Sequence, residues 1–217
     1  MGQSDAEKSS NGEEYRAYRW RFMVLLVHLL LQASTSFQMQ ALPSITNVVV
    51  SYYRVSALAV NWLGLVGILM SLIGFYPLTK AIEKYGIKVA INTVAFLCTL
   101  GACLKYLALG RNFFWLIFVG QICQSVSFQM TLFLTPTIAA VWFKSEESAN
   151  VISIGQVALS LGFGVSFLPS MLIFKHANSI EEIRNGLSTI FISAAIFSVI
   201  FKATDGPECS TKIKGKY

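Results

Sequence analysis

Six long apolar segments, separated by short charged links, constrain this chain more than any other feature of its sequence. The first five have the roughly 20 residues that a helix needs to cross a bilayer, where every backbone amide must bond within its own segment, and the last is the shortest. They cover residues 22–41, 57–79, 89–109, 113–140, 151–174 and 187–201. None alternates polar and apolar residues as the strands of a membrane barrel do. The sequence therefore predicts an all-α membrane protein, a six-transmembrane-helix bundle.

The placement of the basic residues gives an expected topology. The net charge of +6 is typical of nucleic-acid binding, but the basic residues lie in the links and at the two ends. Assigning the links alternately to two sides puts twelve Lys and Arg residues on one side and five on the other. This asymmetry is the positive-inside bias of membrane proteins. We therefore expect both termini to be cytoplasmic and no nucleic-acid partner. The plasma membrane is the default expectation for such a protein and does not follow from the charges.

Composition along the chain predicts three parts. Residues 1–17 are polar and lack apolar periodicity, which predicts a disordered cytoplasmic arm. Residues 18–203 form the transmembrane bundle. Residues 204–217 are expected to be a cytoplasmic tail, and their composition resembles the start of a truncated central loop.

Polar residues in the first and fourth segments follow helical spacing, so that each segment has one polar stripe. Isolated polar residues lie in the second and fifth segments. Two interpretations stay open: hydrogen bonds between helices, worth about 0.6 kcal/mol each, or the lining of a cavity for a solute. For the isolated Asn61 and Gln156 the hydrogen-bonding interpretation is favoured. The candidate cavity residues are Gln32, Ser36, Met39, Gln40, Asn61, Gln121, Gln124, Phe128, Gln129 and Gln156.

Little in the sequence indicates catalysis. The chain has two histidines, and no clustered His and acidic residues suggest a metal site. His28 is the one histidine inside an apolar segment and has no evident partner, and Lys105 lies near enough to its segment end to snorkel. We expect no enzyme activity, no metal and no cofactor.

The link after the second segment contains an acidic residue, a glycine and flanking lysines. Glu83, Lys84, Gly86 and Lys88 resemble the conformational latch motif of the major facilitator superfamily, with Glu83 in place of the usual Asp. Gly86 permits a tight turn, and the charges can pair with a neighbouring helix end.

More specific strings resemble one branch, the feline leukaemia virus subgroup C receptor-related transporters, over their N-terminal half only. These strings are Ser36-Phe37-Gln38, Ile45-Thr46-Asn47, Val55-Ser56-Ala57, Asn61-Trp62-Leu63, Val119-Gly120-Gln121 and Ala140-Val141-Trp142-Phe143. The resemblance implies alternating access and uptake of choline or ethanolamine. It also implies two departures: Met39 stands where choline-transporting members carry a cage Trp, and Phe128 where they carry a substrate-contacting Gln.

The sequence therefore predicts a secondary transporter, or half of one, for a small organic solute of the choline or ethanolamine type. Haem or another small metabolite is the alternative solute. Its partners would be the solute, the lipid bilayer, and a second six-helix half or a second copy of the chain. The alternative is a truncated isoform or fragment that transports nothing and acts as an interaction or regulatory partner.

Overall fold

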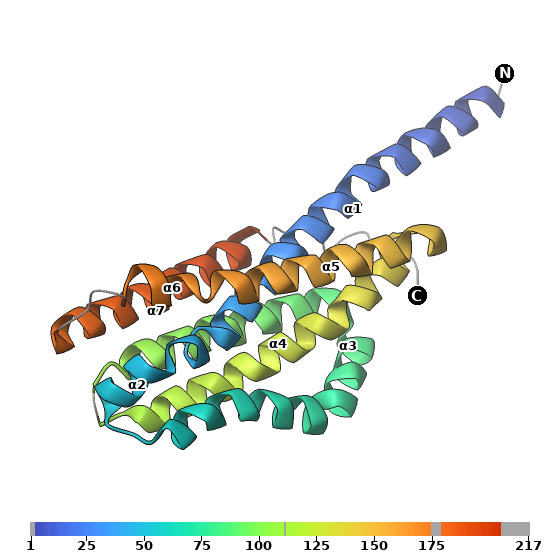
Figure 1. Cartoon of the computed structure of the whole chain (residues 1–217). Helices are drawn as coiled ribbons and strands as arrows, with labels where there is room; N and C mark the ends of the chain where they lie inside the picture. Colours follow the sequence, from blue (N-terminus) through green and yellow to red (C-terminus); the bar gives the residue numbers. More distant parts are fainter. Residues whose placement is uncertain (1–2, 111, 175–178, 205–217) are drawn as a thin grey trace.

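The computed structural model describes residues 3–110, 112–174 and 179–204, and all regular structure in these ranges is helical (Figure 1). In chain order the elements are α1 (Gln3–Gln40), η1 (Pro43–Ile45), α2 (Thr46–Tyr53), α3 (Ala57–Leu107), α4 (Phe114–Trp142), α5 (Ser145–Val165), α6 (Leu168–Leu172) and α7 (Ile180–Thr204). The predicted tail after Thr204 lies outside the described residues.

Four stretches among the described residues are long and apolar enough to cross a membrane. They are Arg21–Tyr53, Ala57–Leu107, Phe114–Trp142 and Ser145–Val165. The prediction of an all-α, multi-pass membrane protein is confirmed. The count of six spans is not, because the second and third predicted segments are both parts of α3 and α7 is not among the four.

α3 has 51 residues, far more than one crossing requires, and it bends at Gly86. Gly86 has φ 81° and ψ 166°, a conformation that residues with a Cβ rarely adopt. The bend separates two helical arms, and Figure 1 shows the second running back in the opposite direction to the first. The predicted segments 57–79 and 89–109 fall one on each arm, so the glycine lies where the sequence predicts a turn.

α1 begins earlier and the fifth segment ends earlier than the sequence predicts. α1 starts at Gln3 and projects beyond the other helices (Figure 1), through the predicted disordered arm, whose Ala, Glu, Lys and Gln residues favour helix. The fifth predicted segment, 151–174, is divided between α5 and α6. Pro169 lies in the first turn of α6, where its missing N–H and fixed φ suit a new helix start.

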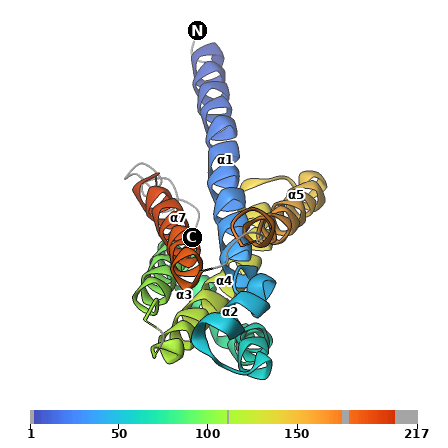
Figure 2. The ribbon, with the colours of Figure 1, turned by 60° about the vertical axis from the view of Figure 1, so that its left-hand side comes forward.

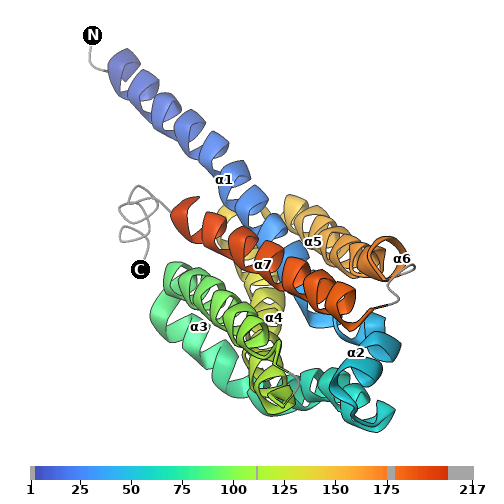
Figure 3. The same ribbon diagram turned by 90° about the vertical axis from the view of Figure 1, so that its left-hand side faces the viewer.

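The helices pack around α1 and α4. α3 and α4 share the most extensive contact, α5 packs mainly on α1 and also on α4, and α7 packs on α3. Figure 2 shows α7 and α5 on opposite sides of α1, and in the view of Figure 3 α7 crosses in front of α1. α1 and α4 therefore form the interior of the bundle, and their predicted polar stripes lie there.

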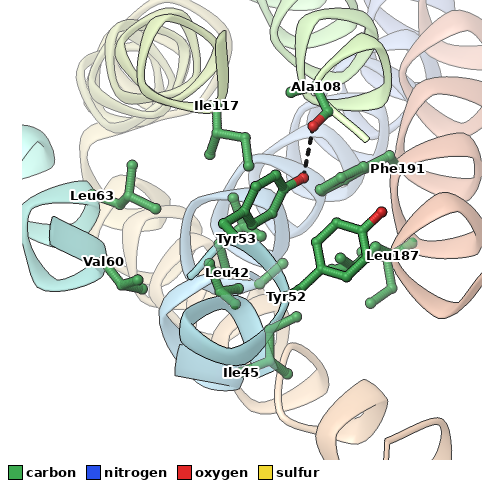
Figure 4. Close-up of a cluster of buried hydrophobic side chains, with 13 residues drawn as sticks. Leu42, Ile45, Tyr52, Tyr53, Val60, Leu63, Ala108, Ile117, Leu187 and Phe191 are labelled. Carbon is green, nitrogen blue, oxygen red and sulfur yellow. Dashed lines mark hydrogen bonds between the residues drawn. The ribbon is translucent and has the colours of Figure 1, made fainter. Parts of the chain in front are cut away.

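A cluster of buried apolar residues closes the end of the bundle where α1 gives way to η1 and α2 (Figure 4). Tyr52 and Tyr53 of α2 project into this cluster. Their hydroxyls donate to the carbonyls of Leu109 and Ala108, at 2.7 and 2.8 Å. These carbonyls follow the last turn of α3, so α2 satisfies backbone acceptors that the helix leaves without partners.

Replacing Tyr53 with Phe removes one of these bonds while keeping the ring. Tyr53 is 6% exposed, so the Ala108 carbonyl would lose a buried donor. We expect a loss of about 1–2 kcal/mol in stability, read as a lower thermal midpoint of the purified protein in detergent. Tyr76→Phe is the control, because Tyr76 is 68% exposed and its substitution should leave the midpoint unchanged.

Candidate functional site

The polar stripe of α1 is buried in the middle of the bundle. Gln32, Thr35 and Ser36 are each no more than 1% exposed. Thr35 and Ser36 donate to the Gln32 carbonyl of their own helix, at 2.9 and 2.7 Å. Such bonds satisfy the hydroxyls within the helix and leave the glutamine side chains to bond across helices.

The stripe of α4 faces that of α1 directly. The Gln121 amide nitrogen donates to the Met39 carbonyl at 3.0 Å and lies 3.5 Å from the Met39 sulfur. Gln124 donates to the Thr35 carbonyl at 3.4 Å, and Ser125 approaches the Met39 sulfur at 3.6 Å. For these residues the arrangement matches the interpretation of hydrogen bonds between helices.

A second polar cluster contains His28, which the sequence predicts to be without a partner. That expectation is wrong: the His28 Nε2 lies 2.8 Å from the Thr135 hydroxyl, which also lies 3.2 Å from the Gln32 Oε1. Among the residues that the structure describes, the Nδ1 of His28 and the Nε2 of Gln32 have no hydrogen-bond partner. His28 and Gln32 are one helical turn apart, and this spacing is the sequence signal that could have indicated a shared site.

Lys105 also differs from its prediction. It does not snorkel to a surface but is 3% exposed, and its ammonium donates to the Gln38 carbonyl at 3.4 Å. The reason is the position of the α1 end, whose carbonyls offer an acceptor inside the bundle.

The remaining candidates are scattered. Gln129 accepts a 2.5 Å bond from Ser71 of α3, and Gln40 is half-buried at the end of α1. Asn61 and Gln156 are exposed, so the bundle does not use them as bonds between its helices. Gln156 lies in an open groove of about 510 Å³ formed almost wholly by α5; its lining is Gln156, Val157, Ser160, Leu161, Gly164, Val165 and Leu168.

Phe128 has an aromatic partner that sequence reasoning missed. Its ring centroid lies 5.8 Å from that of Phe163 on α5, with the ring planes inclined by 49°. Both side chains are half-buried. No local pattern in the sequence signals this pair, because its members come from two helices that meet only in the folded chain.

The latch residues make local contacts. Glu83 lies 4.0 Å from Lys80 within α3, and Lys84 lies 5.4 Å from the ring centroid of Tyr85. Their predicted role in conformational change stays a prediction.

Sequence reasoning also missed an ion pair near the Gly86 end of the bundle. The Arg21 guanidinium donates to both carboxylate oxygens of Glu147, at 2.8 and 3.3 Å. It also lies 5.0 Å from the ring centroids of both Phe22 and Phe143. The pair joins the apolar part of α1 to the first turn of α5.

The described residues hold no group of three or more His, Cys, Asp or Glu side chains that could bind a metal ion. What the arrangement does offer is a polar interior between α1, α3 and α4, with an aromatic pair at the side where α4 meets α5. These features fit a polytopic protein of the transporter class better than a chemical active site.

Comparison with known proteins supports this class. No protein-family model matches the chain. It is 30% identical over 185 residues to an uncharacterised MFS-type transporter of Caenorhabditis elegans, covering 85% of this chain and 31% of the relative. It is 28% identical over 187 residues to the choline/ethanolamine transporter flvcr2a of Danio rerio, covering 86% of this chain and 40% of the relative. With the choline/ethanolamine transporter FLVCR2 of Homo sapiens it shares 30% identity over 173 residues, 80% of this chain and 33% of the relative.

The chain thus spans about a third of the length of the curated relatives that it matches. It belongs to the feline leukaemia virus subgroup C receptor-related branch of the major facilitator superfamily.

Proposed function

We propose that this chain forms the N-terminal six-helix half of a transporter that moves a small organic amine, of the choline or ethanolamine class, by alternating access. The spans would be α1, the two arms of α3, α4, α5 with α6, and α7. Both termini would be cytoplasmic and the membrane would be the plasma membrane. A second six-helix unit, in the same assembly, would face the bundle and rock against it.

The observation that carries this proposal is the Phe128–Phe163 pair. No Asp or Glu occurs in any of the six apolar segments, so a cationic solute within the membrane could not be neutralised there by a carboxylate of this chain. Aromatic faces are the other common recognition element for quaternary ammonium groups. The printed names of flvcr2a and FLVCR2 assign choline and ethanolamine to those relatives, which supports the same solute class here.

The packing of Met39 supports a structural role for this residue and leaves contact with the solute to other side chains. Its methyl group fits where Gly67 of α3 has no side chain, because a Cβ at Gly67 would collide with it. Its sulfur contacts Gln121 and Ser125. Met39 is thus 9% exposed and is held by the bundle. Direct solute contact would then fall mainly to Phe128 and Phe163, with the exposed Gln156 and Asn61 as further candidates.

Uptake of labelled choline by cells that express the chain tests the proposal. We expect saturable uptake, and we expect Phe128→Ala to lower it roughly 5- to 30-fold at low choline concentration, equivalent to the 1–2 kcal/mol of a cation–π contact. Phe128→Tyr keeps an aromatic face and should keep most of the uptake. Phe163→Ala should behave like Phe128→Ala.

Trp115→Leu is the matched control, because Trp115 is an exposed aromatic residue in the first turn of the same helix. It should leave uptake unchanged. Absence of saturable uptake for both choline and ethanolamine would reject this solute class. Equal uptake by the parent chain and Phe128→Ala, at equal surface expression, would reject the aromatic pair as the solute contact.

A further inference from the structure

The end of α1 lies inside the bundle, and its last carbonyls receive donors from several parts of the chain. A helix leaves its final four carbonyls without partners and carries a partial negative charge there. Here one carbonyl is bonded by the turn that follows and three by side chains. The bonds are Ala41 N–H to the Phe37 carbonyl at 2.9 Å, Lys105 Nζ to Gln38 at 3.4 Å, Gln121 Nε2 to Met39 at 3.0 Å and Ser44 Oγ to Gln40 at 2.7 Å.

Lys105 reaches this end through a narrow passage between α3 and α4. The two helices approach closely at Gly101 and Gly120, where a Cβ on either residue would lie 2.9 Å from the carbonyl oxygen of the other. A Cβ on Gly120 would also lie 3.0 Å from the Lys105 Cγ. The aliphatic stem of the lysine thus lies against Gly120, which has no side chain to obstruct it.

The ammonium of Lys105 has no carboxylate partner among the described parts of the chain. The two ion pairs among the described residues are Arg21–Glu147 and Lys80–Glu83, and neither includes Lys105. A buried charge costs several kcal/mol unless groups of opposite polarity surround it. In this bundle the group of opposite polarity is the α1 terminus.

Carbonyls at the C-terminal end of a broken membrane helix are also what a small monovalent cation binds in transporters. We propose that the end of α1 is a monovalent-cation site that the chain fills with its own Lys105 ammonium. Lys105 is then a positioning residue. It fixes the Gln38 carbonyl, and the adjacent Met39 is held with it. The effect on solute uptake rests on the proposed function, but occupancy of the site by a cation does not.

The test replaces Lys105 with Ala in the purified chain and measures thermal unfolding in detergent. Equal concentrations of sodium, potassium, ethylammonium or N-methylglucamine chloride are compared. In N-methylglucamine chloride, whose cation is too large to enter the place of the Lys105 ammonium, we expect Lys105→Ala to have a lower thermal midpoint than the parent chain. At least one of the three small cations should raise that midpoint by about 3–6 °C, increasing with concentration as ligand binding requires. The parent chain should show no such difference among cations.

Three variants act as controls. Lys105→Met fills the passage without a charge and should be destabilised equally in all four salts. Lys84→Ala removes an exposed lysine and should match the parent in every salt. If Lys105→Ala does not fold, Lys105→Ser, which also leaves the passage open, goes through the same salt series with the same expectation.

A Lys105→Ala midpoint equal to that of the parent in N-methylglucamine chloride would overturn the proposal. So would a lowered midpoint that no small cation raises. Uptake is measured separately, in sodium and in N-methylglucamine medium. Lack of uptake by the parent chain, together with a cation-dependent midpoint of Lys105→Ala, would reject the proposed transport while upholding the cation site.

Discussion

Replacing Gly162 with Ala should destabilise the bundle by about 2–3 kcal/mol, whereas the same change at Gly164, two residues along the same helix, should not. A Cβ at Gly162 would collide with the Ala33 carbonyl oxygen and lie 2.8 Å from the Ser36 Cβ. These atoms belong to α1, so α5 could keep its helix only by moving away from α1. At Gly164 no heavy atom lies within 4 Å of an added Cβ.

Gly162→Ala is expected to lower the stability of the bundle, and Gly164→Ala is not. Alanine has the higher helix propensity, by up to about 1 kcal/mol in a helix interior, so Gly164→Ala should be neutral or stabilising. Thermal unfolding of the two purified variants in detergent measures both effects, with Gly162→Ala lowering the midpoint by roughly 5–10 °C. Equal midpoints for the two variants would contradict the close packing of α5 on α1.

Replacing Arg21 with Ala should cost about 2–4 kcal/mol. The Arg21 side chain is 8% exposed, so its removal leaves Glu147, whose side chain is 40% exposed, without its partner at the start of α5. It also removes the cation that lies 5.0 Å from the ring centroids of both Phe22 and Phe143. Arg21→Lys keeps the charge but loses the two-pronged bond and the planar guanidinium, so it should recover only part of the loss.

The second ion pair of the described residues is the matched control. Lys80 and Glu83 lie 4.0 Å apart with side chains 61% and 64% exposed, and such a pair contributes little. Lys80→Ala should therefore leave the thermal midpoint unchanged. A double-mutant cycle with Arg21→Ala and Glu147→Gln isolates the pair itself. A coupling energy near zero would show that Arg21 stabilises the bundle through its aromatic neighbours alone.

In this chain, sequence periodicity predicts well which face of a helix points into the bundle. The offsets of Gln32, Thr35 and Ser36 put them on one face of α1, and the structure shows that face buried. A glycine between charged residues predicts a turn, and Gly86 has the positive φ of one. These features depend on neighbours within one or two helical turns, which the sequence contains directly.

What the sequence does not contain is the partner across the interface. A stripe of amides has the same spacing whether it faces a solute or another helix, and only the packing of α4 on α1 shows that Gln121 bonds to the Met39 carbonyl. The inward direction of Lys105 depends on where a different helix ends. The Phe128–Phe163 pair depends likewise on the angle at which α5 meets α4.

The interlocking helix ends have a consequence for synthesis. The donors that bond to the end of α1 include Lys105 on α3 and Gln121 on α4, while the carbonyls after α3 are bonded by Tyr52 and Tyr53 of α2. A ribosome completes α1 well before it reaches either of the first two donors. The newly inserted first span must therefore keep its Gln38 and Met39 carbonyls hydrated, or bonded to the insertion machinery, until α3 and α4 arrive. Membrane integration of this bundle is in that respect a joint event, in which the end of α1 is completed only after α3 and α4 have entered the bilayer.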